Sequence, residues 1–106
     1  MSRWPVITSP ENRIFKLAKS LAKVKFRRQA RLFPAEGFQL ITELINAGLQ
    51  PEFVLASAAF LESKNGQQLL WQLPKRTSVY EIEPTLLNKL AETVTPQGIW
   101  AAFPII

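Results

Sequence analysis

The chain has 106 residues, of which 47% are hydrophobic, carries a net charge of +5, and contains neither cysteine nor histidine. This composition predicts one folded domain without a membrane span, and it excludes disulfides, the usual zinc sites and any nucleophile pair that needs histidine or cysteine. The acids are all glutamates and are scattered, so we expect no metal site and no catalysis in this chain. We expect no signal peptide, because no apolar run follows the first residues, and the absence of cysteine favours a cytoplasmic location.

Positive charge is concentrated at the start of the chain. Residues 1–31 hold nine of the thirteen Lys and Arg residues and a single acid, Glu11, whereas residues 32–106 hold four bases and seven acids. A protein whose charges served solubility alone would intersperse the two signs. The segregation therefore indicates a surface that faces a polyanion, and nucleic acid fits better than an anionic membrane.

The first predicted helix follows Thr8-Ser9-Pro10-Glu11, which has the residues typical of a helix start, with Ser9 as the cap. Apolar residues then recur at the helical period and predict a buried stripe at Ile14, Leu17, Leu21 and Val24. Basic residues occupy a separate arc at Arg13, Lys16, Lys19 and Lys23. This arc is either a solvated face or a face for phosphate, and we favour phosphate because the arc leads directly into a second basic segment.

That second segment, residues 25–31, is predicted to be an exposed loop that grips anions, since so many cations are almost never buried together. Residues 32–35 follow as a short strand. Pro34 cannot donate to a sheet ladder, so this strand is expected at an edge or at a bulge. Gly37 suits a sharp turn that launches the next helix.

Strand-like and helix-like stretches alternate through the rest of the chain. The predicted strands are Phe53–Ala56, Ser78–Ile82 and residues 99–103, and the predicted helices are residues 40–45, Ala58–Glu62, 67–73 and a segment opened by Glu83-Pro84-Thr85. Residues 63–66 and 95–98 are predicted to be loops. The alternation predicts the α/β class, as a three-layer α/β/α sandwich with a central sheet of about four strands and right-handed crossovers.

The basic segment supplies the candidate functional residues. Its arginines suit bidentate phosphate contacts and its lysine a point contact, at Lys25, Arg27, Arg28 and Arg31. Phe26 lies among them and either stacks on an unpaired base or anchors the loop in the core. Glu36 either orients an arginine or accepts a hydrogen bond from RNA, or else it is a first-turn acid favoured by the helix dipole.

Several motifs in order resemble one known family. The central pattern is Lys25-Phe26-Arg27, then Phe33, then Glu36-Gly37 followed by Leu40-Ile41; Ile7-Thr8-Ser9 with Asn12 precedes it, and Thr93-Val94-Thr95-Pro96-Gln97-Gly98-Ile99 follows near the end. Together they resemble the amino-terminal substrate-binding domain of SpoU/TrmH-type RNA 2′-O-ribose methyltransferases of the SPOUT superfamily. The resemblance covers roughly residues 7–103.

The resemblance implies a fold like that of small ribosomal and kink-turn RNA-binding proteins, and a role in gripping structured RNA, either ribosomal or transfer RNA. The RNA-contacting positions that match are Asn12, Lys25, Arg27 and Glu36-Gly37, to which the basic arc adds Lys16, Lys19 and Lys23. Two residues depart from the family pattern. Arg31 stands where the family often has a small residue, and Pro34 replaces an aliphatic strand residue.

The resemblance also implies what lies outside this chain. We expect residues 1–106 to be one RNA substrate-binding domain, followed beyond Ile106 by a knotted catalytic domain that binds S-adenosylmethionine, in a parent enzyme that forms a homodimer. The chain itself is expected to bind no cofactor. Two alternatives stay open: a stand-alone RNA-binding protein that recognises a structured or bent RNA element, and a protein-interaction module whose basic face meets an acidic partner. The exposed apolar ending, residues 99–106, favours a chain that continues.

Overall fold

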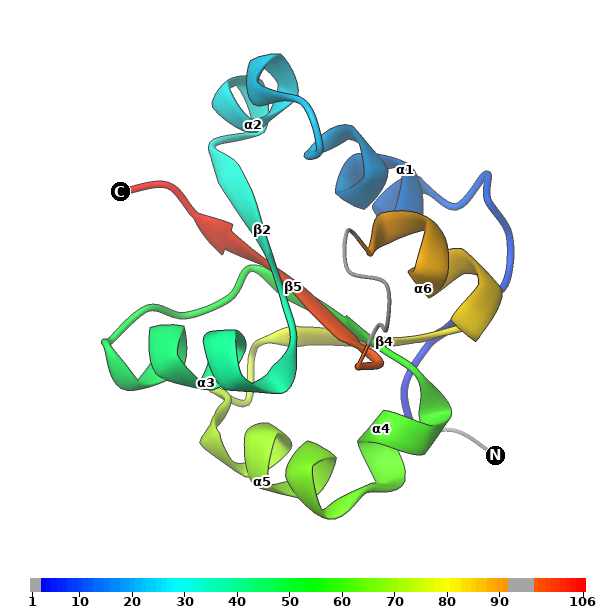
Figure 1. Ribbon diagram of the computed structural model, residues 1–106, viewed down its shortest axis with the longest axis vertical. Coiled ribbons are helices and arrows are strands. Elements are labelled where there is room, and N and C mark those ends of the chain that lie inside the picture. The colour runs from blue at the N-terminus through cyan, green and yellow to red at the C-terminus, as the bar shows by residue number, and fades with distance from the viewer. Residues whose placement is uncertain (1–2, 92–96) are drawn as a thin grey trace.

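A five-stranded mixed sheet runs through the middle of the computed structural model, which describes residues 3–91 and 97–106 (Figure 1). Side by side, its strands are β1 (Val6–Ile7), β4 (Ser78–Ile82), β3 (Phe53–Ala56), β5 (Ile99–Pro104) and β2 (Leu32–Glu36). The pairs β1–β4 and β3–β4 are parallel, whereas β3–β5 and β2–β5 are antiparallel. The sheet has one strand more than expected, because β1 is too short to show an alternating pattern.

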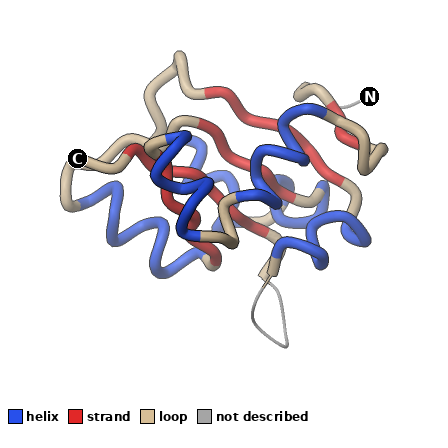
Figure 2. Tube along the Cα trace, turned by 90° about the horizontal axis from the view of Figure 1, so that it is seen from above, coloured by secondary structure: helices blue, strands red, loops and turns tan. Residues whose placement is uncertain are grey.

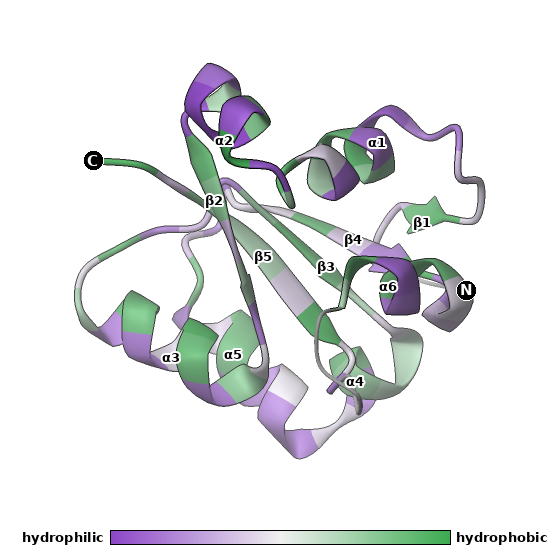
Figure 3. Cartoon of the chain, turned by 45° about the horizontal axis from the view of Figure 1, so that its top comes forward, coloured by the Kyte–Doolittle hydropathy of each residue, from purple (hydrophilic) through white to green (hydrophobic). Residues whose placement is uncertain are grey.

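Helices cover both faces of the sheet, so the predicted three-layer sandwich is confirmed. One layer contains α1 (Arg13–Ser20), α2 (Val24–Ala30) and α6 (Pro84–Leu90), and the other contains α3 (Phe38–Asn46), α4 (Ala58–Glu62) and α5 (Lys64–Gln72) (Figure 1). The strand β1 and the C-terminal end lie on opposite sides of the fold (Figures 2 and 3). Within the described residues, none of these helices has the length and apolar character needed to cross a membrane.

The central strands divide their side chains between two cores. In β3, Phe53 and Leu55 join the core beneath α1 and α6, whereas Val54 joins the core beneath α3, α4 and α5. In β5, Trp100 belongs to the first core and Phe103 to the second. Strands buried on both faces read as continuous apolar runs, which is why these two segments showed no alternation.

The apolar ending of the chain was expected to be exposed, and for most of its length this is wrong. Residues 99–103 are at most 3% exposed, because β5 lies between β3 and β2 rather than at a free terminus. Within this ending, the exposed large apolar side chains are Ile105 and Ile106. The expectation about Pro34 is confirmed, since β2 is an edge strand, and Gly37 has the positive φ of +95° that its turn requires.

Two predicted boundaries differ from the structure. α1 begins at Arg13 and not at Pro10, because the side chain of Asn12, rather than Ser9, caps the helix. It also ends at Ser20, so Val24, expected in the buried stripe, is 53% exposed. Residues 93–96 lie outside the described residues. They belong to the family-like segment at residues 93–99, and the predicted turn at residues 95–98 begins among them.

The predicted loop at residues 63–66 is also wrong, because α5 begins at Lys64. The Ser63 hydroxyl caps this helix by accepting a hydrogen bond from the Gly66 N–H at 3.0 Å. A Cβ atom at Gly66 would lie 1.8 Å from the carbonyl oxygen of Phe60 in α4. The glycine therefore serves the close packing of α5 on α4, and it does not mark a loop.

We expect Gly66→Ala to lower the free energy of unfolding by about 1–3 kcal/mol, the usual cost of overpacking a filled site. Alanine is the better helix former, so a loss must come from the contact with the Phe60 carbonyl. Chemical denaturation followed by circular dichroism measures it. The matched control is Asn65→Ala at the exposed neighbouring position, expected within about 0.5 kcal/mol of the parent. A Gly66→Ala protein as stable as the parent would contradict the packing argument.

Candidate nucleic-acid interface

The basic segment at residues 25–31, predicted to be a loop, is helix α2 together with its C-terminal cap. No residue of α2 is buried, so the sequence lacks the apolar stripe that would have predicted this helix. The helix is held by Arg27, whose Nε donates to the carbonyl oxygen of Leu21 at 2.8 Å and whose Nη2 donates to that of Ala22 at 3.1 Å. These carbonyls follow the end of α1, so Arg27 joins the two helices by satisfying backbone groups that lack helical partners.

Helix α2 ends in a left-handed residue. Arg31 has a φ of 58°, and its N–H bonds to the carbonyl oxygen of Arg27. Among the described residues, Arg31 is the only one other than glycine with a positive φ. A left-handed C-terminal cap suits glycine, because an L side chain there is strained. The backbone conformation gives a physical reason why a small residue would suit this position.

A groove of about 970 Å³ opens between α1, α2, the end of α6 and the edge of the sheet. Its sheet side includes Pro34 and Glu36 of β2 and touches Trp100 of β5. Side chains alternate along β2, so these two residues point to the same side as Leu32, which belongs to the α1 core. The groove exists because α1 and α6 cover the inner strands but leave this part of the edge strand open.

Cations from three helices, and from the N-cap of α2 at Lys23, line the groove. The helical ones are Lys16, Lys19, Arg27 and Lys89. The described acids in its lining are Glu11, which pairs with Lys16 at 3.2 Å, and Glu36. Figure 3 shows the hydrophilic colour of α2 and of part of α1 beside the apolar strands. Cations lining a concave surface focus a positive potential there, which attracts a polyanion.

The structure brings together only part of the predicted site. Lining the groove are Lys16, Lys19, Lys23, Arg27 and Glu36, whereas Asn12, Lys25, Arg28 and Arg31 lie outside it. Lys89 was missed, because in the sequence it is one isolated lysine. It reaches the groove through the packing of α6 beside α1, which share one core. The one feature of the sequence that could have drawn attention to Lys89 is its position near the end of the helix that Glu83-Pro84-Thr85 opens.

Two of the predicted residues have clear structural roles. The Oδ1 atom of Asn12 accepts hydrogen bonds from the N–H groups of Ile14 and Phe15, at 2.8 and 3.0 Å, and so caps α1. Arg27 fastens α2, as described above. Their contacts with RNA stay predictions. Lys25 places its Nζ atom 5.8 Å from the ring centroid of Phe26.

Phe26 does not anchor a loop in the core. It is 36% exposed, is absent from both core clusters, and lines the groove. The alternative in which it meets a ligand is therefore the one that the geometry supports.

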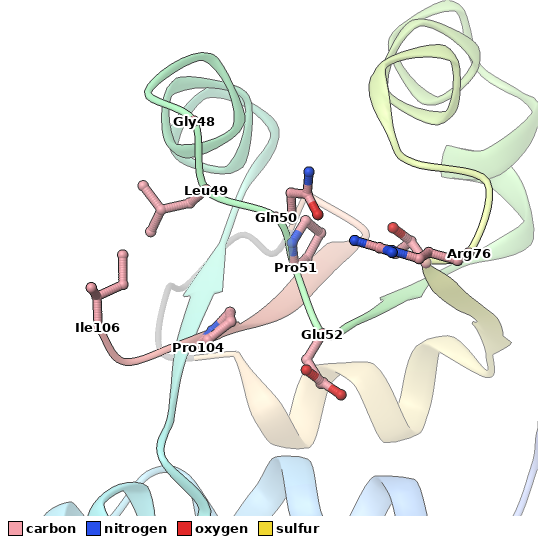
Figure 4. A pocket seen from close by; sticks show the side chains of 9 residues that line it. Gly48, Leu49, Gln50, Pro51, Glu52, Arg76, Pro104 and Ile106 are labelled. Carbon is pink, nitrogen blue, oxygen red and sulfur yellow. The ribbon is translucent and has the colours of Figure 1, made fainter.

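Two other hollows lack this charge pattern. One, of about 460 Å³, lies between Gly48 and Ile106, where Arg76 points toward Gln50 and the acid Glu52 offsets its charge (Figure 4). Another has Glu81 and Glu83 in its lining and no cation among its described residues. Neither suits a polyanion, and the described residues include no group of three His, Cys, Asp or Glu placed to hold a metal ion.

The comparisons of sequence and of structure with known proteins agree with each other. The sequence profile of the MRM3-like substrate binding domain matches residues 12–101. Among solved structures, an RNA 2′-O ribose methyltransferase is similar with a TM-score of 0.81 and 27% identity, over 95% of this chain and 38% of that chain. No curated protein matches this sequence.

Two further structures show the same fold at lower identity. The SpoU methyltransferase AviRb from Streptomyces viridochromogenes, in complex with AdoMet, has a TM-score of 0.79 and 23% identity over 91% of this chain and 36% of that chain. An rRNA methyltransferase from Sinorhizobium meliloti has a TM-score of 0.74 and 20% identity over 97% of this chain and 38% of that chain. The chain thus spans little more than a third of the length of these proteins.

We expect Arg27→Gln to lower the free energy of unfolding by about 1–2 kcal/mol, since it removes charge-assisted hydrogen bonds to two backbone carbonyls. Arg28→Gln makes the same change in charge at an exposed position of the same helix and should stay within about 0.5 kcal/mol of the parent. Thermal and chemical unfolding of both variants measures the difference. Equal effects would mean that Arg27 does not hold α2.

We expect Arg31→Gly to raise the free energy of unfolding by about 1 kcal/mol, because glycine adopts the left-handed conformation without strain. The matched change Gln29→Gly, inside α2, should lower it by about 1 kcal/mol through helix propensity. The opposite signs are the test, read from denaturation midpoints. A loss of stability at both positions would show that the Arg31 side chain supports the fold.

Proposed function

The chain belongs to the MRM3-like substrate binding domain family, and on that premise we propose that it is the RNA-recognition domain of a SpoU/TrmH-type RNA 2′-O-ribose methyltransferase. The observation that carries the proposal is that five cations, from α1, α2 with its N-cap residue, and α6, line one groove. Solved methyltransferases with this fold support it, since one of them at 27% identity is an RNA 2′-O ribose methyltransferase.

The groove cations contact RNA phosphates in this proposal. Lys16, Lys19, Lys23 and Lys89 give point contacts, and the Arg27 guanidinium adds its charge while its bonded N–H groups hold α2. RNA contacts are also proposed for four residues in or beside α1 and α2 that lie outside the groove: Asn12, Lys25, Arg28 and Arg31. Glu36, inside the groove, is proposed to meet the RNA as well.

Catalysis is proposed to occur elsewhere in the complete protein. We propose that residues 1–106 form one substrate-binding domain, and that a catalytic domain following it binds S-adenosylmethionine and methylates the RNA. Support comes from the share of the relatives that this chain spans, 38% and 36%, and from the AdoMet bound in one of those relatives. The proposed substrate is ribosomal or transfer RNA, the proposed parent enzyme is a cytoplasmic homodimer, and no cofactor site is assigned to this chain.

The proposal predicts that binding depends on the groove cations. The triple change Lys19→Gln, Lys23→Gln, Lys89→Gln should weaken binding of bulk ribosomal or transfer RNA on the order of 100-fold at 0.1 M salt, and lower the slope of log affinity against log salt by about 2 to 3. Each lost phosphate contact removes about 0.7 to 0.9 of that slope. Filter binding across a salt series measures both quantities.

The control removes the same charge elsewhere. Lys64→Gln, Lys75→Gln, Arg76→Gln changes three cations that do not line the groove, and it should leave the slope nearly unchanged. Circular dichroism should show both triple variants folded. Equal losses in the two variants would reduce the binding to a general effect of net charge, and an absence of binding to any RNA would overturn the proposed function.

A further inference from the structure

The groove is not lined by charge alone. Its lining also includes Phe26 of α2, Pro34 of β2, Leu40 of α3 and Leu90 of α6. Phe26 is 36% exposed and Leu40 is 45% exposed, and the other two are half-buried. Apolar side chains from four elements thus share one concave surface with four lysines.

Phe26 keeps 36% of its surface exposed although it is a large apolar residue. It is a member of neither core cluster, and no residue of its helix is fully buried. The exposed part of the ring forgoes the free energy that its burial would supply. Single exposed apolar residues are common, but this one lies inside a groove whose charge selects an anionic ligand.

A regular RNA duplex would not use this apolar surface. Its bases are stacked inside the helix, and it presents phosphates and riboses to a protein. An unpaired nucleotide, in contrast, exposes a base whose flat face stacks on an aromatic ring, while its neighbouring phosphates reach out to cations. A groove of about 970 Å³ is at the upper end of the range for ligand pockets, roughly 300–1,000 Å³, and has room for a base with its flanking backbone.

We propose that the groove binds an unpaired nucleotide of the RNA, with the base against Phe26 and Pro34 and the adjacent phosphates on Lys19, Lys23 and Lys89. The inference rests on the proposed function and narrows it. The RNA element that this domain recognises contains a bulge or a loop, and an uninterrupted duplex binds only through its phosphates. Charge selects RNA in general, and the apolar part of the groove selects the unpaired base.

Two hairpin RNAs test this, identical except that one carries a single unpaired 2-aminopurine nucleotide in its stem. The parent chain should bind the bulged hairpin more tightly and should change its fluorescence, since 2-aminopurine emission depends on whether the base is stacked in the RNA stem or has left it. Phe26→Ala should weaken binding of the bulged hairpin roughly 5- to 150-fold, the range for the loss of one stacked base. It should leave the fully paired hairpin and the salt slope unchanged, because no charge is altered.

Two variants serve as controls. Val24→Ala removes another exposed apolar side chain of α2, 53% exposed and outside the groove, and should bind both hairpins as the parent does. Phe26→Tyr keeps an aromatic ring and should retain both the preference and the fluorescence change, which separates stacking from any effect on folding.

The outcomes separate this inference from the proposed function. Equal binding of the two hairpins by the parent, or an equal loss for both on Phe26→Ala, overturns the unpaired-base site and leaves the RNA-binding domain intact. An absence of binding to both hairpins and to bulk RNA overturns the proposed function, and the inference falls with it.

Discussion

The position of β5 between β3 and β2 is the constraint on which the rest of the structure depends. The strand pairs antiparallel with both neighbours, and its residues 99–103 are almost completely buried. Because side chains alternate along a strand, this one segment supplies Trp100 to one core and Phe103 to the other. The edge strand β2, which turns Pro34 and Glu36 toward the groove, is joined to the described sheet through β5.

The groove depends further on how α2 is attached. Only Ala30 of this helix packs against a core, so hydrogen bonds from Arg27 to the carbonyls of Leu21 and Ala22 supply much of its attachment. The same side chain lines the groove. One arginine therefore supplies charge to the surface and also positions α2, which carries Phe26.

The gathered cations suit the RNA that we propose as the ligand. Five like charges line one groove, and the exposed pair between Lys16 and Glu11 offsets little of their repulsion. In the proposed complex, RNA phosphates neutralise these cations and counterions of the RNA are released. The proposed contact with the apolar side chains of the groove adds a term that does not weaken with salt.

The sequence by itself determined the fold class, the turn at Gly37, the concentration of cations in residues 1–31, and that Pro34 lies at an edge or a bulge, because each follows from local pattern or composition. It also carried the family resemblance. It could not reveal β1, which is two residues long, or helix α2 at Val24–Ala30, because hydrogen bonds from the Arg27 side chain to carbonyls five and six positions back attach it. Gly66 was misread because the approach of α4 to α5 is a tertiary contact. Only the tertiary structure decided that Lys89 joins the cations of the first helices, and that Phe26 stays exposed among them, because both follow from how α6 and α2 are placed around the edge of the sheet.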